Sequence, residues 1–564
     1  MLGPSLLEGL FRQSSPAQAR SALAQLLPEN ASAAEKTGAV EAALRGPLGE
    51  SLRAGVGNWI VEHLVPVESL VPAEYVSWRP PVRDAMLFVI GHLSAARLAP
   101  KLLEQLELPS DMPPEMRLLR LIAKVPGLQK LGQVIARNRY LRPSLRKALS
   151  ELENGIHDVS APEIRAIIES ELGPRLEKFA VQIEPAILSE ASVSAIVRCN
   201  WLNPKSGLRE EGVFKVLKPH IPAFFAEDMD LLQGLADFFG SKYQEYGIAK
   251  DVLTDTFHKV RKLLQHEVHL IGEQKTLVEA AALYRSVPKV RVPQVFPSLC
   301  TPKITAMSEE HGIKITDAVA HLSASRRAQV AEKLIEALIA VPLLAPQESA
   351  LFHADPHAGN LFYNEHTGEL TILDWALTER LSREQRRHLA LLVFMAGLRD
   401  PVGSCNEIQA LSQSPAGRSA KSARIIREIV NGFFDALPLR RVPSAVDAMR
   451  LLQRSATQGV RFPAPLIMLS KVLFTLDGVV SDIRGSGVSL AYSVARHGLQ
   501  SWLLWGTSAK LPITVNDLIR VHCSAIFYSG RLSIKVEQAL LNRLLPPDSG
   551  RRFGPDKAGA DPTA

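Results

Sequence analysis

The chain has 564 residues, of which 46% are hydrophobic and 22% charged, with a formal net charge of +7. This length allows two or more folding units with buried cores. Its 65 basic residues are spread along the chain without long basic blocks, so nucleic-acid binding is not expected, whereas attraction to an anionic membrane surface stays open.

The four cysteines lie far apart with no CxxC spacing, which indicates a reducing compartment. The first residues lack the basic region of a signal peptide. No stretch of about 18 uninterrupted apolar residues predicts a membrane span, and the tryptophan-containing segment 499–506 is too short for one. We therefore expect a cytoplasmic protein, with peripheral membrane association through an amphipathic helix still open.

Hydrophobic periodicity predicts helices over residues 1–115 and 116–175, strands over 181–197 and 212–217, and one long helical pattern over 249–284. Short strands are predicted over 291–316, and helices dominate from about residue 325. Strands followed by helices are typical of the α+β, two-lobed protein-kinase-like fold.

The expected domains follow this order. They are a helical N-terminal region (1–115), a helical extension (116–175), a kinase-like small lobe rich in strands (176–310), a helical large lobe with C-terminal helices (311–545), and a disordered tail (546–564).

The most informative segment is the run LFHADPHAGNLFY at 351–363, followed by LTILDW at 370–375. It places Asp355, Asn360 and Asp374 in order on a loop and a predicted strand–turn–strand unit. Oxygen donors suit Mg²⁺, and a carboxylate near the attacking hydroxyl or water suits phosphoryl transfer. Asp355 is thus the predicted catalytic carboxylate, while Asn360 and Asp374 are the predicted magnesium ligands.

Two other interpretations of this run remain open. Asp355-Pro356 could simply begin a turn. The segment His353-Ala354-Asp355-Pro356-His357 could instead form a metal cluster of the hydrolase kind, although no further His/Cys cluster nearby completes a zinc shell.

A lysine and a glutamate upstream fit the phosphate-binding part of a small lobe. Lys215 lies on the alternating strand Val213-Phe214-Lys215-Val216-Leu217, and Glu273 lies on the helical pattern that follows. A strand lysine held by a helix glutamate can neutralise the α- and β-phosphates of a nucleotide. Taken alone, each residue would pass for an ordinary solvated surface charge.

The segment PGLQKLGQ at 126–133 would pass by composition for the polar face of a helix. Its Lys-x-Gly-Gln pattern, together with the His-Ala-Asp-Pro-His-x-Gly-Asn run, resembles the UbiB/AarF/ADCK family of atypical kinase-like proteins over residues 116–382. The resemblance implies that Lys130, Gln133 and Glu267 belong to a segment that covers the active site where a protein substrate would lie. It therefore implies ATP or ADP binding with Mg²⁺, and ATPase or small-molecule kinase activity rather than protein phosphorylation.

The same resemblance assigns further roles. Lys215 matches the family's phosphate-binding lysine and Glu273 its partner. The loop containing Ala191 and Ser192 corresponds to the family's alanine-rich nucleotide loop, and a hinge that contacts adenine corresponds to three consecutive residues, Met307, Ser308 and Glu309.

Three departures from the family pattern stand out. Glu190 replaces an alanine of the usual Ala-Ala-Ala-Ser loop, and a carboxylate near phosphates is repulsive unless it points away or meets a cation. His269 replaces the second acidic residue of the family's Glu-x-Asp pair, and Ala376 stands where Asp-Phe-Gly has its glycine.

The resemblance also implies support of ubiquinone or other isoprenoid-lipid metabolism at a membrane, with an isoprenoid lipid as a partner. One alternative function is a nucleotide-binding pseudokinase or lipid-binding scaffold. Another is an aminoglycoside- or choline-kinase-like phosphotransferase, since these enzymes also follow the loop with Asp-Trp. The sequence leaves the phosphate acceptor and the oligomeric state undetermined.

Overall fold

The computed structural model describes residues 31–136, 141–151, 158–204, 206–413, 420–438, 441, 443–484 and 511–544. The predicted disordered tail and the segment 499–506 lie outside these residues. The chain forms two compact units. The first comprises Met1–Ala281, Pro293–Glu310 and Asp374–Leu377, and the second comprises Ala282–Val292, His311–Leu373 and Thr378–Ala564.

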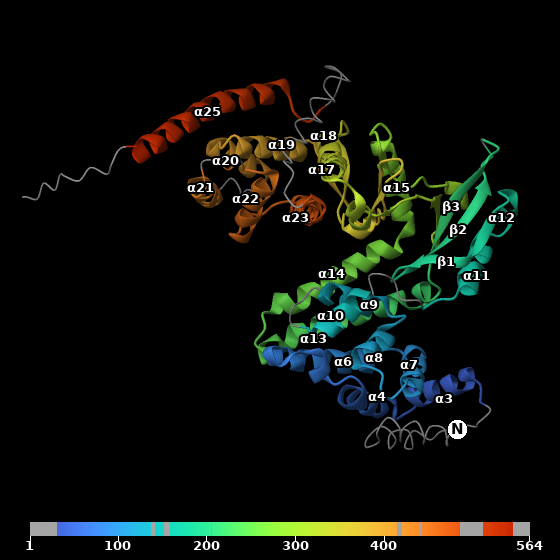
Figure 1. Cartoon of the computed structure of the whole chain (residues 1–564). Coiled ribbons are helices and arrows are strands. Elements are labelled where there is room, and N and C mark those ends of the chain that lie inside the picture. The colour runs from blue at the N-terminus through green and yellow to red at the C-terminus, as the bar shows by residue number, and fades with distance from the viewer. Residues whose placement is uncertain are drawn as a thin grey trace, which may run out of the picture. The chain divides into compact units, whose positions relative to one another are not determined.

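The first unit begins with a run of helices (Figure 1). Their bounds are α3 (Ala33–Arg45), α4 (Gly49–Trp59), a π-turn η1 (Ile60–Leu64), α5 (Val67–Leu70), a 3₁₀ segment η2 (Ala73–Trp78), α6 (Arg79–His92), α7 (Ala95–Glu107), α8 (Pro114–Ile122), α9 (Pro126–Ala136), α10 (Pro143–Glu151), α11 (Ala161–Leu172) and α12 (Pro174–Lys178). This confirms the helices predicted before the first strand wherever the structure describes the chain.

A four-stranded antiparallel sheet follows, with strand order β1-β2-β3-β5. Its strands are β1 (Gln182–Glu190), β2 (Ser194–Leu202), β3 (Arg209–Leu217) and β5 (Ile304–Ser308). Side chains of a strand alternate between faces, so buried Phe214 and Val216 pack beside α11 while Lys215 lies on the opposite face. Lys215 is opposite Ile196 of β2 and Thr305 of β5.

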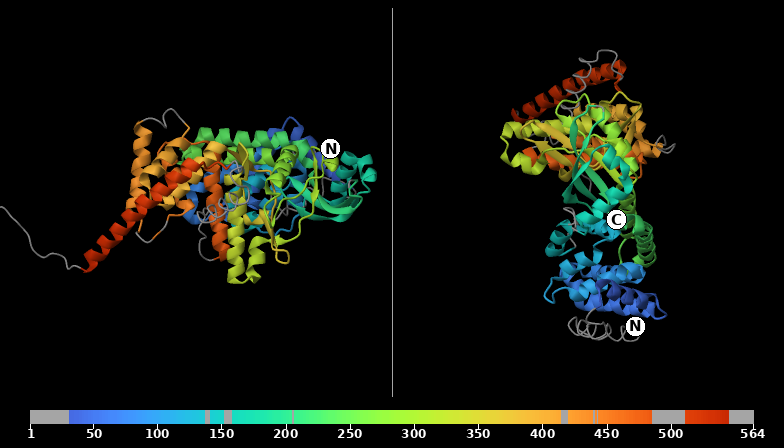
Figure 2. Two further views of the ribbon diagram at one scale, coloured as in Figure 1. Left: turned by 90° about the horizontal axis from the view of Figure 1, so that it is seen from above. Right: turned by 90° about the vertical axis from the view of Figure 1, so that its right-hand side faces the viewer.

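Three longer helices complete this unit: α13 (His220–Tyr246), α14 (Lys250–Val268) and α15 (Leu270–Tyr284), the last of which runs into the second unit. Figures 1 and 2 show α13 and α14 side by side, with α9 against them. A second hydrophobic core joins α13 and α14 to the N-terminal helices through leucines such as Leu98, Leu235 and Leu264. The extension helices therefore share a core with the helices that follow the sheet.

The predicted continuous helix over 249–284 is broken. His269 has non-helical backbone angles (φ −87°, ψ 69°), α14 ends before it and α15 begins after it. Glu267 lies before the break and Glu273 after it, and each pairs with a lysine, as described below.

The second unit holds two small sheets and a set of helices. Strand order is β4-β9-β8-β6 in one sheet and β10-β7 in the other. The strands are β4 (Val290–Arg291), β6 (Ile313–Lys314), β7 (Ser349–His353), β8 (Leu361–Asn364), β9 (Glu369–Ile372) and β10 (Thr378–Ser382). The predicted strand–turn–strand is confirmed, because β8 and β9 pair antiparallel from Leu361↔Ile372 to Asn364↔Glu369.

The helices of this unit carry most of its core. They are α16 (Ile315–Ala318), α17 (Ala324–Ile335), a π-turn η6 (Glu336–Ala340), α18 (Val341–Leu344), α19 (Arg383–Gly397), α20 (Pro401–Leu411), α21 (Ala420–Asp435), α22 (Ala445–Thr457), α23 (Ala464–Arg484) and α25 (Val515–Leu544). In the described ranges, no single helix is long and apolar enough to cross a bilayer, and one pair, Ala73–His92 with Ala95–Glu107, meets that test only with a 119° bend.

Candidate functional site

Lys215 and Glu273 form a buried ion pair in the first unit. The Lys215 Nζ donates to both carboxylate oxygens of Glu273, at 2.7 and 2.8 Å. The two side chains are 12% and 2% exposed, so neither is the solvated surface charge that its residue type alone would suggest. Burial by itself would lower the pKa of Lys215, but attraction to Glu273 and Asp374 raises this pKa above its ordinary value. Lys215 therefore keeps its positive charge.

Neighbouring polar groups fix this pair in place. Gln274 donates to the Thr301 and Ile304 carbonyls at 3.0 and 3.1 Å and to the Thr305 hydroxyl at 3.1 Å. These bonds attach the first turn of α15 to strand β5, which pairs with β3. The strand that carries Lys215 and the helix that carries Glu273 are thus held together by more than the ion pair.

Asp374 lies beside Lys215 with its carboxylate open to solvent. Its Oδ1 is 3.6 Å from the Lys215 Nζ, and its side chain is 46% exposed. Its backbone is left-handed, with φ of 54°. Aspartate adopts this conformation more readily than most non-glycine residues. The next residue, Trp375, is fully buried, and its carbonyl accepts a 2.8 Å hydrogen bond from Thr276 of α15.

The loop at 353–360 of the second unit, which carries the predicted catalytic carboxylate, is fixed by hydrogen bonds to its main chain. The Asp355 N–H donates to His353 Nδ1 at 3.2 Å, and the Asp355 carbonyl accepts from the His357 N–H at 2.9 Å and from Asn360 Nδ2 at 3.2 Å. The Asp355 carboxylate itself is 43% exposed. The loop therefore presents this carboxylate while holding its main chain still.

Asn360 and Asp374 have the donor chemistry that Mg²⁺ requires. The Asn360 amide nitrogen is used by the Asp355 carbonyl, which orients the amide and leaves its oxygen as the group for a cation. The Asp374 carboxylate is half exposed and charged, and oxygen ligands of this kind suit a hard cation that keeps other positions for water and phosphate. Each residue by itself therefore offers an oxygen donor of the kind that suits the metal implied by the motif.

The hydrolase-type metal cluster finds no support in this geometry. His353 Nε2 lies 3.0 Å from the Leu373 carbonyl while Nδ1 accepts from Asp355, so both ring nitrogens already bind backbone groups. The Nδ1 of His357 accepts from the Gly359 N–H at 3.1 Å. Within the described residues, no group of three or more His, Cys, Asp or Glu side chains is placed to hold a metal ion.

The extension helix contacts the small-lobe elements through Lys130, which forms an ion pair with Glu267 of α14. Glu267 also accepts a 3.2 Å hydrogen bond from the Ser192 hydroxyl. One carboxylate therefore joins the Lys-x-Gly-Gln segment to the loop that contains Ala191 and Ser192. Gln133 lies nearly one turn further along α9 and is partly buried.

The predicted hinge residues Met307, Ser308 and Glu309 lie at the end of β5. The Ser308 N–H donates to the Gln294 carbonyl at 2.9 Å, and the Glu309 N–H donates to the Glu211 carbonyl at 3.4 Å. These two N–H groups are used inside the protein and so are not offered to adenine. The hinge role stays a prediction.

Sequence reasoning missed the partners of the unusual Glu190. This carboxylate lies 3.0 Å from the Nζ of Lys218, which also lies 2.6 Å from Asp158 Oδ1. The condition set by the sequence, that Glu190 must point away or meet a cation, is met by Lys218. Lys218 follows directly after β3, and no local pattern links it to Glu190, which lies 28 residues earlier.

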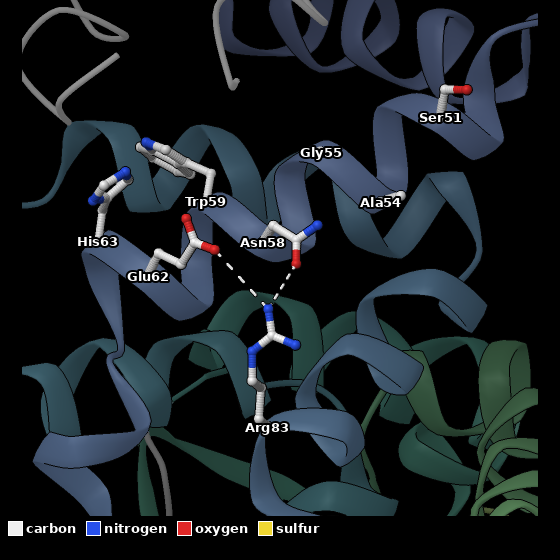
Figure 3. A pocket seen from close by; sticks show the side chains of 8 residues that line it. All are labelled: Ser51, Ala54, Gly55, Asn58, Trp59, Glu62, His63 and Arg83. Carbon is white, nitrogen blue, oxygen red and sulfur yellow. Dashed lines mark hydrogen bonds and ion pairs between the residues drawn. The ribbon is translucent and has the colours of Figure 1, made fainter. Parts of the chain in front are cut away.

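A separate open hollow of about 490 Å³ lies among the N-terminal helices (Figure 3). It lies over α4 and the π-turn that follows. Arg83 reaches toward Asn58 at 3.1 Å and Glu62 at 3.9 Å, so its principal cation already has partners. None of the residues predicted for the nucleotide site lines it.

Comparison with known proteins gives a family. Residues 151–405 match the model of the ABC1 atypical kinase-like domain. The chain is 24% identical over 362 residues to an uncharacterized protein, sll1770, of Synechocystis, covering 64% of this chain and 60% of that protein. It is 23% identical to the probable protein kinase UbiB of Actinobacillus pleuropneumoniae, covering 66% of this chain and 68% of that protein.

A plant relative matches a shorter region. The chloroplastic ACTIVITY OF BC1 COMPLEX KINASE 1 of Arabidopsis thaliana is 27% identical over 266 residues, covering 47% of this chain and 37% of that protein. Among solved structures, the Rv3197–erythromycin complex from Mycobacterium tuberculosis is similar with a TM-score of 0.44 and 16% identity, over 64% of this chain and 89% of that chain.

Proposed function

The chain belongs to the UbiB/ADCK family of atypical kinase-like proteins, and from this membership we propose that it binds ATP or ADP with Mg²⁺ and acts as an ATPase or small-molecule kinase. The observation that carries the proposal is the buried Lys215–Glu273 ion pair with the Asp374 carboxylate 3.6 Å from the same Nζ. A lysine held in this way offers a fixed positive charge to nucleotide phosphates.

The remaining roles follow from the chemistry of each side chain. Asn360 and Asp374 would hold Mg²⁺, which neutralises phosphate charge when bound. Asp355, whose carboxylate is exposed on a fixed main chain, would accept the proton of the attacking hydroxyl or water. Lys215 would move from its contact with Asp374 toward the phosphates while keeping Glu273 as its partner.

The acceptor is proposed to be water or a small molecule. In the family that the chain resembles, the Lys-x-Gly-Gln segment occupies the space that a protein substrate needs, and here Lys130 of that segment is fixed by its ion pair with Glu267. Through its UbiB relatives we further propose a role in ubiquinone or other isoprenoid-lipid metabolism, with peripheral binding to an anionic membrane.

The first experiment measures thermal unfolding of the purified chain with and without MgATP or MgADP. A ligand present at 100 times its Kd should stabilise the protein by about 2.7 kcal/mol. Asp374→Asn should lose most of the magnesium-dependent stabilisation by nucleotide, because the substitution replaces a charged oxygen ligand by a neutral one. The matched control is Asp237→Asn on the exposed face of α13, whose unfolding temperature should rise with nucleotide as that of wild type does. Equal nucleotide shifts in wild type and Asp374→Asn would contradict the metal role.

The second experiment measures ATP turnover with and without anionic liposomes and a phenolic isoprenoid analogue. Asp355→Asn should bind MgATP like wild type but lower turnover by about 10²–10⁴-fold, the usual contribution of a general base. Turnover that is the same in Asp355→Asn as in wild type would remove Asp355 from the reaction.

The second candidate is a nucleotide-binding pseudokinase or lipid-binding scaffold. It is favoured by the family departures, above all His269, which stands in the break between α14 and α15 where relatives carry a second carboxylate. This candidate predicts that wild type is stabilised by nucleotide or lipid yet shows no turnover with any acceptor. An aminoglycoside- or choline-kinase-like reaction is separated by adding those acceptors to the same assay.

A further inference from the structure

The Glu190 side chain lies in a closed ionic cluster at the end of β1. Its partners Lys218 and Asp158 have side chains that are 0% and 4% exposed, and Glu190 is itself 2% exposed. Asp158 adds a backbone bond, since its N–H donates to Glu190 Oε2 at 3.3 Å. A carboxylate enclosed in this way is not open to a phosphate or a metal ion from solvent.

This cluster holds the loop at 189–193, which we call the nucleotide loop, to the segment that leads from the extension helices. Lys218 binds the loop twice, with its Nζ on Glu190 and with its backbone N–H on the Val193 carbonyl at 3.0 Å. Asp158 accepts further bonds from Gln129 Nε2 at 3.4 Å and the Lys124 N–H at 3.2 Å.

Gln129 and Lys130 are consecutive residues of α9, and each belongs to a separate attachment of the nucleotide loop. Gln129 reaches it through Asp158 and Lys218, and Lys130 reaches it through Glu267 and Ser192. The Glu190 attachment depends on a residue that departs from the family pattern, so it is a property of this chain.

We propose that Glu190 is a positioning residue: its pairing with Lys218 and Asp158 fixes the nucleotide loop, and Lys218 keeps the Glu190 charge from repelling nucleotide phosphates. The inference rests on the proposed function in one respect, namely that this loop contacts the nucleotide. An unpaired Glu190 would act on the charged phosphates of ATP but hardly on adenosine, which has none.

The test compares the Kd of ATP and of adenosine by calorimetric titration. Lys218→Met should weaken ATP binding by about tenfold more than adenosine binding, because Glu190 is then unneutralised. The double variant Lys218→Met/Glu190→Gln should return the ratio of the two Kd values to that of wild type. Glu190→Gln alone should weaken adenosine binding because it loosens the loop, and it should weaken ATP binding by no more than that factor because it also removes a negative charge.

Two binding results would overturn the inference. Tighter ATP binding by Glu190→Gln would mean that the carboxylate already faces the phosphates in wild type. An unchanged ratio of Kd values in Lys218→Met would mean that Lys218 does not neutralise it. A general loss of stability cannot imitate the predicted pattern, because instability does not distinguish ATP from adenosine.

A third measurement needs neither nucleotide nor the Lys218 variant. Amide hydrogen exchange of residues 189–194 without ligand should be faster in Glu190→Gln than in wild type, including at the Ala191 N–H that donates to Ser194 at 2.8 Å. The matched control is Glu171→Gln, which removes an ion pair of the same unit, with Lys303 at 2.7 Å, and should leave loop exchange unchanged. Unchanged exchange in Glu190→Gln overturns the positioning role. If wild type binds neither ATP nor adenosine, the proposed function fails while this measurement still decides the inference.

Discussion

The buried Lys215–Glu273 pair makes each partner depend on the other. Removing one member of a buried ion pair leaves an uncompensated charge, which costs about 3–5 kcal/mol. Substitution of Lys215 should therefore lower the free energy of unfolding. A loss of nucleotide binding in a Lys215 variant must be compared with its loss of stability.

We predict that Lys215→Met lowers the free energy of unfolding by about 3 kcal/mol, because the carboxylate of Glu273 stays buried without its cation. The double variant Lys215→Met/Glu273→Gln should recover a large part of that loss while still failing to bind MgATP. Urea unfolding followed by circular dichroism measures the stability of both variants. A Lys215→Met protein as stable as wild type would show that the pair is open to water in solution.

Gly212 of β3 lies where no side chain fits. A Cβ atom at this position would be 2.1 Å from the ring of Trp201 and 2.7 Å from the Met307 carbonyl oxygen. Trp201 is 2% exposed and stacks on Phe296 at 5.1 Å between ring centroids, so it has little freedom to retreat.

Gly212→Ala should therefore lower the free energy of unfolding by about 2–3 kcal/mol, within the usual cost of overpacking. The control is Gly432→Ala in helix α21, where nothing lies within 4 Å of the added carbon. That variant should instead gain about 0.5–1 kcal/mol from helix propensity. Relative to wild type, the urea midpoint should fall in Gly212→Ala and rise in Gly432→Ala. Changes of the same sign would contradict the prediction.

At the scale of elements, helix α7 buries charges against the extension. Arg97 is 4% exposed and pairs with Asp228 of α13 at 2.9 Å, while Lys101 is 8% exposed and donates to the Ala123 carbonyl. Burial, together with nearby Arg97, lowers the pKa of Lys101 to about 8. The free energy of unfolding should therefore vary with the charge state of this lysine.

We predict a pH dependence that follows from this shift. An unfolded lysine titrates near pH 10.4, so between about pH 8 and 10.4 the unfolded chain holds a proton that the folded chain has released. The free energy of unfolding of wild type should rise over this window by about 2 kcal/mol relative to Lys101→Met. Urea unfolding of both proteins at pH 7.5 and pH 10 measures the difference, which would stay constant if Lys101 were solvated.

Sequence patterns predicted most elements that depend on local periodicity. The β8–β9 hairpin and strand β3 followed from alternation of apolar residues and turn chemistry. The break at His269 did not, because no proline marks it and the apolar pattern continues across it.

The residues of the candidate site also differ in how far the sequence could predict their contacts. Asp355, Asn360 and Asp374 are close in sequence, so their motif alone singled them out. The pairing of Lys215 with Glu273 was predicted from order along the chain, and the geometry agrees with it. The contacts of Glu190 with Lys218 and Asp158 bridge 28 and 32 residues, and a single sequence holds no signal for such distances.

At the scale of the whole chain, the last described helix is held to the rest of the second unit by several polar contacts, one of which is through a buried carboxylate of its own. Asp517 at the start of α25 is 0% exposed and accepts hydrogen bonds from Arg387 of α19 at 2.6 and 2.7 Å. Burial would raise the pKa of Asp517, but the bonds from Arg387 and Thr514 hold it well below its usual range. Further along, α25 exposes Ile519, Ile526 and other apolar side chains.

Asp517→Asn should loosen this attachment, because charged hydrogen bonds contribute about 1.5–3 kcal/mol each and the amide keeps at most one of them. Amide exchange over residues 515–520 should speed up by at least about tenfold. Exchange in α22, which has its own capping box at Ser444 and Asp447, serves as the internal control and should not change. Equal protection of 515–520 in both proteins would assign the attachment to other contacts.

The division of the chain into units has a consequence for how the protein is made. The polypeptide passes between the two units at 281/282, 292/293, 310/311, 373/374 and 377/378. Strand β3 leaves the ribosome long before β5, its partner at the edge of the first sheet, so a nascent chain ending near residue 281 exposes an unpaired strand edge. A fragment that ends at that boundary should therefore aggregate more readily than the full chain.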